Sequence, residues 1–180
     1  MFSQILFAQF FFIITVLFST TLPLYSCEPV IENTEPDSET IHVGDKLPFF
    51  TIETSQGDTL STDDLLGKPT VLVFFHTMCG DCQRELPVVE SLYQKYGKEV
   101  RFVCISREQT DEEVAAYWEK HQLSIPYSAQ TDRSVFSLFA SSTIPRIYIT
   151  DTTNTITAIF IEKADAQELE EAIKQHCTKE

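Results

Sequence analysis

The sequence predicts an α/β domain built on a central mixed sheet with flanking helices. The apolar runs 69–75 and 100–106 lie between turn residues and are typical of strands covered on both faces. Segments of helical periodicity follow each run, which favours parallel pairing of the two strands. Two further strand-like segments, 146–150 and 155–161, are joined by a polar turn and predict a terminal antiparallel hairpin.

In the first half of the domain, a small hairpin precedes the first core strand. Segments 49–53 and 58–60 are joined by a glycine-containing turn, which indicates two short antiparallel strands. A helix is expected over 80–96, directly after the first core strand, because its apolar residues fall on one face. Gly97 is expected to end that helix.

In the second half, three more helices are expected. Thr110 and Glu113 have the spacing of a capping box and open an inserted helix that runs to His121. A short helix is expected over 132–139, capped by the aspartate at its start. A final helix begins after Asp165, which is a favourable N-cap residue.

The first 44 residues are predicted to lie outside the domain, which spans 45–180. Residues 1–26 resemble a lipoprotein-type signal peptide, because they are apolar, lack charged side chains and end in a lipobox-like segment, Leu24–Cys27. This resemblance implies cleavage before Cys27 and lipidation of its sulfur; an uncleaved signal anchor is the alternative. Residues 27–44 are acidic and contain proline, so we expect a tether.

The formal net charge of −14 limits the partners of the chain. No basic stripe is present to neutralise phosphates, which argues against binding to nucleic acid. The same charge disfavours electrostatic docking on anionic lipid, so attachment to the membrane would come through the lipid anchor. The localisation expected from these features is the bacterial cell envelope, with the domain facing the periplasm.

The chemistry of the chain is predicted to lie at Cys79 and Cys82, two of its five cysteines. This Cys-x-x-Cys pair follows the carboxyl end of a central strand and opens a helix, where open α/β sheets place their sites. The helix N-terminus stabilises a thiolate on Cys79, whereas Cys82 lies one turn further in and should keep its proton. Cys79 would attack a substrate disulfide and Cys82 would resolve the mixed disulfide, leaving a redox-active disulfide.

Zinc binding is the alternative use of such a pair. His76 stands three residues before Cys79, which gives a His-x-x-Cys-x-x-Cys spacing. A second pair of ligands is missing from the sequence, so we expect no metal, and the dithiol mechanism needs no cofactor. Cys104 and Cys177 could form a bridge in an oxidising compartment, but two separate thiols are favoured.

The segment Val71–Pro87 resembles the TlpA/ResA-like branch of the thioredoxin family, the membrane-tethered disulfide reductases of bacterial envelopes. A strand, the dithiol and a helix proline, Pro87, occur in the order of that family. The resemblance extends over 43–176 and implies a thioredoxin-like fold with an N-terminal hairpin and an inserted helix. It also implies that Ile144-Pro145 forms the family's cis-proline loop, which lies against the dithiol and binds the substrate backbone.

The same resemblance gives Glu85 a catalytic role, because the family places a glutamate three residues after the second cysteine. The implied role is proton exchange with Cys82, and the alternative is a solvated helix glutamate beside Arg84. The family further implies disulfide-containing envelope proteins as substrates, with cytochrome c maturation as one setting, and a membrane thiol donor as upstream reductant.

Departures from the family pattern bear on the direction of the reaction. The residue between Gly80 and Cys82 is Asp81 instead of proline, and its negative charge disfavours a thiolate on Cys79. A less stabilised thiolate makes a dithiol less oxidising, so a reductant is predicted. A protonated His76 would have the opposite effect.

Two other functions compete with this prediction. A peroxidase of the peroxiredoxin class shares the fold, but its Pro-x-x-x-Thr/Ser-x-x-Cys pattern is absent upstream of both Cys79 and Cys82. A non-catalytic binding lipoprotein would also share the fold, but it would not need the intact dithiol together with Pro87 and Pro145.

Overall fold

Five strands form one mixed sheet in the order β5-β4-β3-β6-β7. The structure is a computed structural model and describes residues 40–177. Strands β3, β4 and β5 are parallel, whereas β6 is antiparallel to β3 and β7 is antiparallel to β6. The predicted mixed sheet and its terminal hairpin are therefore confirmed. The strands are β3 (Thr70–Phe75), β4 (Arg101–Ser106), β5 (Tyr127–Ser128), β6 (Arg146–Thr150) and β7 (Ile156–Ile161).

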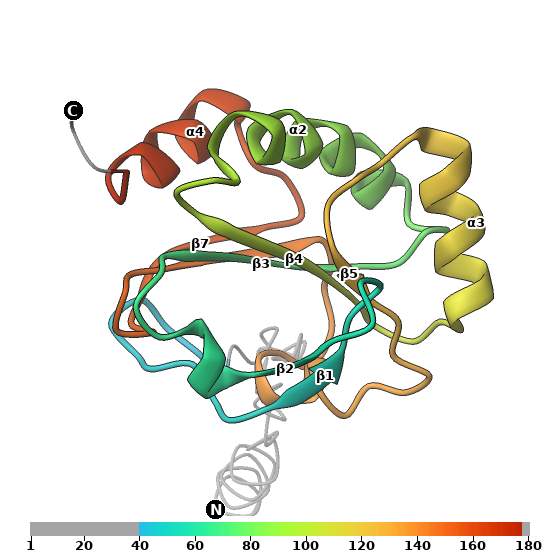
Figure 1. The fold of residues 1–180 in the computed structure, drawn as a ribbon, viewed down its shortest axis with the longest axis horizontal. Coiled ribbons are helices and arrows are strands. Elements are labelled where there is room, and N and C mark those ends of the chain that lie inside the picture. The colour runs from blue at the N-terminus through green and yellow to red at the C-terminus, as the bar shows by residue number, and fades with distance from the viewer. Residues whose placement is uncertain (1–39, 178–180) are drawn as a thin grey trace, which may run out of the picture. The chain divides into compact units, whose positions relative to one another are not determined.

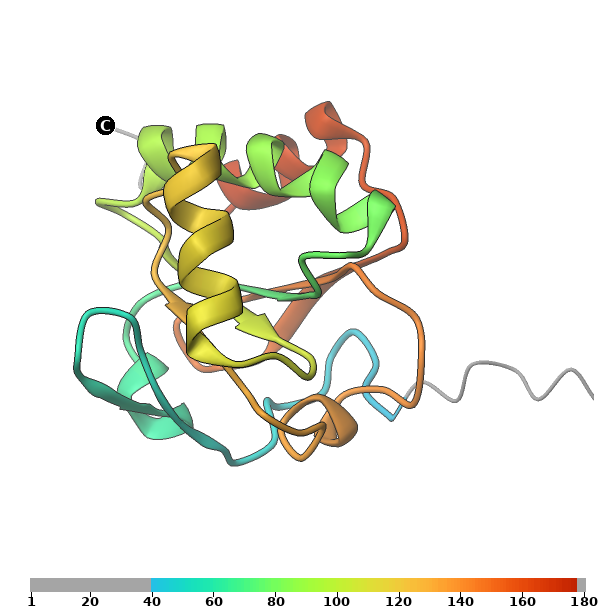
Figure 2. The same ribbon diagram turned by 90° about the vertical axis from the view of Figure 1, so that its right-hand side faces the viewer.

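Two helices cover one face of the sheet and a third stands at the β5 side (Figures 1 and 2). Helices α2 (Gly80–Tyr96) and α4 (Ala166–Lys174) lie side by side, and the Tyr96 hydroxyl donates to the Glu170 carboxylate at 2.6 Å. Helix α3 (Asp111–His121) is the inserted helix. Its capping box is formed as predicted, because Thr110 N–H donates to the Glu113 carboxylate at 3.0 Å.

The opposite face of the sheet is covered by the N-terminal hairpin and two short 3-10 turns (Figure 1). Strands β1 (Thr51–Glu53) and β2 (Thr59–Ser61) pair antiparallel, which confirms the predicted hairpin. The turns are η1 (Thr62–Leu65) and η2 (Phe136–Leu138). Ile41 already belongs to the buried core, so packing begins at the start of the described residues.

Adjacent residues of β3 build the core on the two faces of the sheet. Side chains alternate along a strand, so Phe74 and Phe75 point in opposite directions. Phe74 packs on Phe136 and Phe139, with ring centroids 5.5 and 4.7 Å apart, whereas Phe75 packs on Trp118 of α3 at 4.9 Å. Strand β3 is buried along its whole length and ends directly before the dithiol loop, so that loop starts from a fixed point.

Gly97 ends α2 as predicted, whereas one expected helix is shorter than predicted. Gly97 has a right-handed backbone conformation at the helix end. Glycine is needed there because a Cβ would lie 2.7 Å from the Tyr93 carbonyl oxygen. The expected helix over 132–139 shrinks to η2, because Asp132 accepts a hydrogen bond from Ser134 N–H at 2.7 Å and so shapes a bend before the turn.

The predicted signal peptide, Cys27 and most of the tether lie outside the described residues. Within residues 40–177, no helix has both the length and the apolar character needed to cross a membrane. Cys104 is buried in β4 and Cys177 is half-buried after α4, and both are free thiols.

Candidate active site

Cys79 caps the N-terminus of α2. It has an extended backbone conformation, and its Sγ accepts a hydrogen bond from Cys82 N–H at 3.4 Å. The Cys79 N–H donates to the His76 carbonyl at 3.0 Å, which closes the loop between β3 and α2. A sulfur in the capping position faces the unpaired N–H groups of the first helical turn, and these stabilise negative charge on it. The half-exposed thiol is therefore placed to act as a nucleophile.

Cys82 lies in the opposite environment one turn further along α2. Its side chain is 0% exposed, and burial together with the nearby Cys79 raises the pKa of its thiol. A buried thiol with a raised pKa keeps its proton until a base removes it. The two sulfurs of one motif therefore differ in access, and burial keeps the proton on the inner one.

The Ile144-Pro145 loop lies against Cys79. The peptide bond between these residues is cis, and the Cys79 thiol donates to the Ile144 carbonyl oxygen across 3.7 Å. Arg146 steadies the loop, because its Nε donates to the Thr143 carbonyl at 2.9 Å. Two residues that are 65 positions apart in the sequence thus meet at the reacting sulfur.

Glu85 is buried, with only 7% of its surface exposed. Its Oε1 accepts a hydrogen bond from Ala164 N–H at 3.4 Å, and within the described part of the chain its Oε2 has no hydrogen-bond partner. Burial raises the pKa of the Glu85 carboxyl. Glu85 follows Cys82 by one helical turn. Because it is buried, it is not the solvated glutamate of the alternative interpretation.

His76 and Asp81 have weaker effects on the dithiol than their charges suggest. His76 Nδ1 accepts a hydrogen bond from Met78 N–H at 3.1 Å, and burial followed by the nearby Arg107 lowers the pKa of the imidazole. The lowered pKa favours the neutral imidazole, so His76 adds little positive charge beside Cys79. Asp81 forms an ion pair with Arg84 on the surface of α2, which offsets part of its negative charge. Among residues 40–177, no group of three or more potential metal ligands is found.

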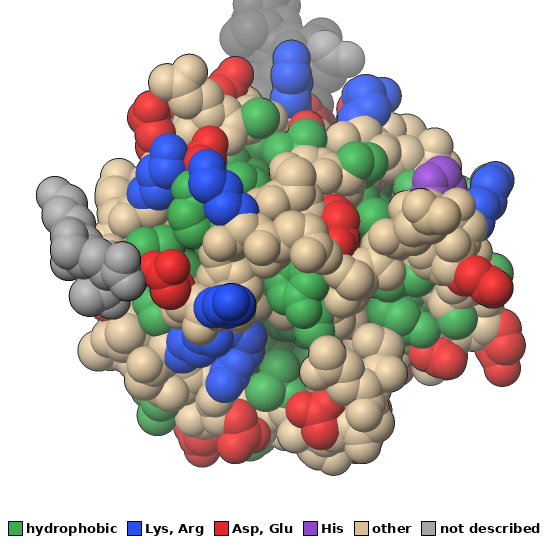
Figure 3. Space-filling view, turned by 45° about the horizontal axis from the view of Figure 1, so that its top comes forward, with side chains coloured by type: hydrophobic (Ala, Val, Ile, Leu, Met, Phe, Trp, Pro, Cys, Tyr) green, Lys and Arg blue, Asp and Glu red, His purple; other side chains and the backbone are tan. Residues whose placement is uncertain are grey.

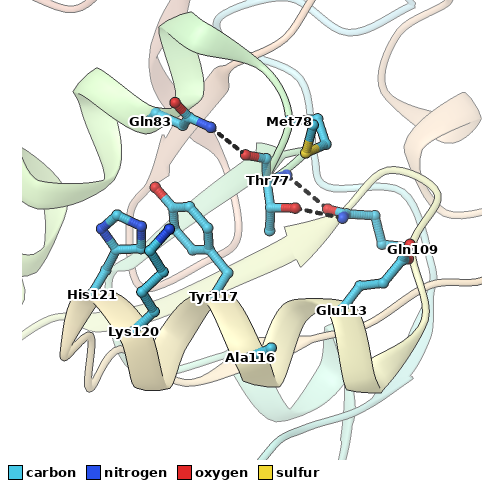
Figure 4. Close-up of a pocket in the computed structure, with 9 residues that line it drawn as sticks. All are labelled: Thr77, Met78, Gln83, Gln109, Glu113, Ala116, Tyr117, Lys120 and His121. Atoms are coloured by element: carbon cyan, nitrogen blue, oxygen red, sulfur yellow. Dashed lines mark hydrogen bonds between the residues drawn. The ribbon is translucent and has the colours of Figure 1, made fainter.

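A clamp around Thr77 was not predicted from the sequence (Figure 4). Gln109 is buried and binds Thr77 twice: Thr77 N–H donates to Gln109 Oε1 at 2.7 Å, and Gln109 Nε2 donates to the Thr77 hydroxyl at 2.6 Å. Gln83 Nε2 donates to the Thr77 carbonyl at 2.7 Å. Every polar group of Thr77 is thus bound, which fixes the residue two positions before Cys79.

Arg107 was also missed. It follows β4 directly, where its N–H donates to the Phe75 carbonyl at 2.8 Å, and its Nη1 donates to the Ser142 carbonyl at 3.3 Å. Its guanidinium lies 5.7 Å from the centre of the Phe136 ring. The positive charge of Arg107 acts to lower the pKa of Cys82, against the larger effect of burial. Its position after a buried strand, next to the strand that leads to Cys79, was the available signal.

The family of the chain follows from a match to known sequences. The model of the AhpC/TSA family matches residues 43–159, a stretch that contains both cysteines and the Ile144-Pro145 loop. The chain belongs to this family. The chain is similar to the thiol-disulfide oxidoreductase ResA of Bacillus anthracis, which is 24% identical over 140 residues, 77% of this chain and 81% of that protein. The thioredoxin-like protein YneN of Bacillus subtilis is 26% identical over 136 residues, 74% of this chain and 79% of that protein.

Solved structures share the fold of this AhpC/TSA-family chain. A putative protein disulfide isomerase from Bacteroides thetaiotaomicron superposes with a TM-score of 0.69 at 23% identity, covering 75% of this chain and 87% of that one. A putative thiol:disulfide interchange protein DsbE from Chlorobium tepidum has a TM-score of 0.69 at 19% identity, covering 76% and 98%. The predictions of a thioredoxin-like fold, of a ResA-like relationship and of thiol-disulfide oxidoreductase activity are confirmed.

Proposed function

We propose that this thiol-disulfide oxidoreductase is a reductant of disulfides in proteins of the bacterial envelope. One observation carries the proposal: Cys79 is half-exposed at a helix N-terminus, whereas Cys82 is fully buried and its pKa is raised. A pair with this asymmetry reacts in a fixed order, because only the exposed sulfur can reach a substrate. The buried sulfur then acts as the resolving group.

In the first step, the Cys79 thiolate attacks one sulfur of the substrate disulfide. The substrate S–S bond breaks, a bond forms between Cys79 and that sulfur, and the other substrate sulfur leaves as a thiolate that takes up a proton. The backbone next to the attacked sulfur binds at Ile144, whose carbonyl oxygen lies 3.7 Å from Cys79 Sγ. This carbonyl would accept a hydrogen bond from a substrate N–H.

In the second step, Cys82 loses its proton and attacks Cys79 Sγ. The mixed disulfide breaks, the substrate leaves with two thiols, and Cys79 and Cys82 remain oxidised as a disulfide. Glu85 is the proposed acceptor of the Cys82 proton, because a buried carboxylate with a raised pKa is a stronger base than an exposed one. A membrane thiol donor would restore the reduced pair.

The direction of the reaction rests on the charges around Cys79. A neutral His76 adds no stabilisation of the thiolate, and the remaining charge of Asp81 opposes it. Strong oxidants of this fold have midpoint potentials of about −120 mV. A measured potential well below that value would support the assignment as a reductant. A potential close to that value would reject it.

Attachment to the envelope is proposed to occur through a lipid on Cys27. The sequence supports this through the lipobox-like segment that ends at Cys27. Metabolic labelling with a radioactive fatty acid would mark the wild-type protein and leave the Cys27→Ser variant unlabelled. Labelling of that variant, or release of wild-type protein from membranes by salt alone, would contradict the anchor.

A trapping experiment tests the function as a whole. The Cys82→Ala variant cannot resolve its mixed disulfides, so substrates should accumulate on Cys79 and be identified by mass spectrometry. The Cys79→Ala/Cys82→Ala double variant is the control and should trap nothing. Apocytochrome c among the trapped proteins would place the protein in cytochrome maturation, whereas peroxide turnover without trapped proteins would favour the peroxidase.

A further inference from the structure

A pocket opens between the loop that precedes Cys79 and helix α3 (Figure 4). It has a volume of about 440 Å³, which lies in the range of ligand-binding pockets. Its wall begins at Met78, the residue directly before Cys79, and neither Ile144 nor Pro145 lines it. The pocket is therefore separate from the loop proposed to bind the substrate backbone. Thr77 also lines the pocket, and α3 contributes Ala116, Tyr117, Lys120 and His121.

The base of this pocket is rigid before any ligand arrives. Thr77 is held by the three hydrogen bonds from Gln109 and Gln83, at 2.6 to 2.7 Å. The wall on α3 is also ordered, because the Tyr117 and His121 rings stack with centroids 4.1 Å apart and an interplanar angle of 26°. A preformed surface loses little entropy when it binds a ligand.

The lining is suited to an uncharged, apolar group. Most of its exposed surface is apolar, and the rim carries one acidic and one basic side chain, Glu113 and Lys120. The Glu113 carboxylate is already bound to Thr110 N–H in the helix cap. The Tyr117 ring, which stacks on His121 and lines the pocket, offers a partner for another aromatic ring. Met78 is 81% exposed, and an exposed, flexible methionine adapts to apolar ligands.

The pocket is continuous with the surface that a substrate must occupy. When Cys79 attacks a disulfide, the substrate sulfur comes within about 2 Å of Cys79 Sγ, which brings its polypeptide against the neighbouring residue Met78. An extended chain advances about 3.3 Å per residue, so a side chain within three positions of the substrate cysteine can reach the pocket.

From this continuity and this chemistry we infer that the pocket is a specificity site for the substrate polypeptide. It binds an aromatic side chain that lies within three residues of the cysteine under attack. The inference rests on the proposed reduction of polypeptide disulfides and adds which sequences are preferred. The inserted helix α3 then selects substrates, in addition to covering the edge of the sheet.

The test uses symmetric disulfide dimers of short peptides, in which either sulfur gives the same product. Each peptide has one cysteine and carries a single phenylalanine at one of the three positions before or after it; the reference peptide has serine throughout. Rates for the reduced full-length protein are divided by its rate on hydroxyethyl disulfide, which has no side chain to bind. At least one phenylalanine position should be reduced ten times faster than the reference.

Variants of pocket residues test whether the preference for phenylalanine arises in the pocket. Ala116→Arg places a long side chain in the pocket from an exposed helix position, and the preference should fall below twofold. Met78→Ser should reduce it as well. Glu119→Gln is the matched control, because it makes the same change in charge on an exposed position of α3 outside the pocket and should keep the full preference.

The outcomes separate the pocket from the reaction itself. Equal rates for all peptides, or a preference that survives Ala116→Arg, would overturn the specificity site while leaving the reductase intact. Failure of the wild-type protein to reduce both the peptides and hydroxyethyl disulfide would instead contradict the proposed reduction.

Discussion

The two sides of the active site differ in how far their reacting groups are exposed to water. On the Cys79 side, the thiol is half-exposed, Met78 projects into solvent and a pocket opens toward α3. On the Cys82 side, the thiol and the Glu85 carboxyl are buried beneath α2 and the chain before α4. The Cys79 side, called the open side below, can receive a substrate. The Cys82 side, called the dry side, can hold a proton away from water. Three residues of spacing are enough to separate these tasks because one lies at the helix end and the other inside the helix.

The largest effect is expected from removing the sulfur on the dry side. The Cys82→Ala variant should lose steady-state reduction by at least about a thousandfold, the scale on which loss of a reacting group acts. Its Cys79 should still react with iodoacetamide, because that thiol depends on the helix N-terminus and not on Cys82. Loss of alkylation together with turnover would mean that the two sides are not independent.

Removing the proton acceptor should have the next largest effect. In Glu85→Gln, resolution of the mixed disulfide should slow by about tenfold to a hundredfold, as for loss of a general base. Formation of that mixed disulfide should be unchanged, and stopped-flow measurements with a fluorescent disulfide separate the two steps. An equal slowing of both steps would show that Glu85 serves the open side.

Glu85→Gln should also change the dependence of stability on pH. Burial raises the pKa of Glu85 in the folded protein, so the folded state binds this proton more tightly than the unfolded chain. The ionised carboxylate therefore lowers stability at pH values above its folded pKa, and this loss disappears as pH falls below the ordinary pKa of glutamate. The variant should be more stable than wild type in urea at neutral pH, with no difference below about pH 4.

The clamp on the open side should contribute mainly to stability. Gln109→Ala leaves Thr77 N–H and the Thr77 hydroxyl unbound in a buried position, which should lower the free energy of unfolding by about 2 kcal/mol. Gln83→Ala is the comparison, because Gln83 is exposed and water can replace its single bond to Thr77. Urea unfolding of both variants measures the difference, and equal losses would argue against the clamp.

Arg107 interacts electrostatically with both Cys79 and Cys82, and its replacement should have the smallest effect on the rate. Arg107→Gln removes a positive charge that lowers the pKa of Cys82, so resolution should slow a few-fold and its pH profile should move to higher pH. Arg107→Lys keeps the charge and should retain most of the wild-type profile. Identical profiles for all three proteins would mean that Arg107 only supports the Ser142 carbonyl.

The elements and the reacting cysteines could be predicted from the sequence because their signals are local. Apolar runs marked β3 and β4, the Thr110 capping box marked α3, and the Cys-x-x-Cys spacing marked the helix start. The clamp could not be predicted in this way, because Gln109 and Thr77 are 32 positions apart.

Their meeting depends on the register in which β3 pairs with β4, and Phe75 stands opposite Ser106 in that pairing. Sequence periodicity shows that both strands are buried but not how they are aligned. The neutral state of His76 depends on burial and on Arg107, so it was also beyond the local pattern. Gly97 ends α2 as predicted, and the close contact with Tyr93 that requires a glycine there was not visible in the local pattern.

The burial of Cys104 limits which disulfides the protein can form during its reaction cycle. It is completely buried in β4, and burial raises the pKa of its thiol. A thiol without access or negative charge takes no part in disulfide exchange. The working pair can therefore pass through many oxidised and reduced cycles without forming a disulfide to the sulfur of Cys104.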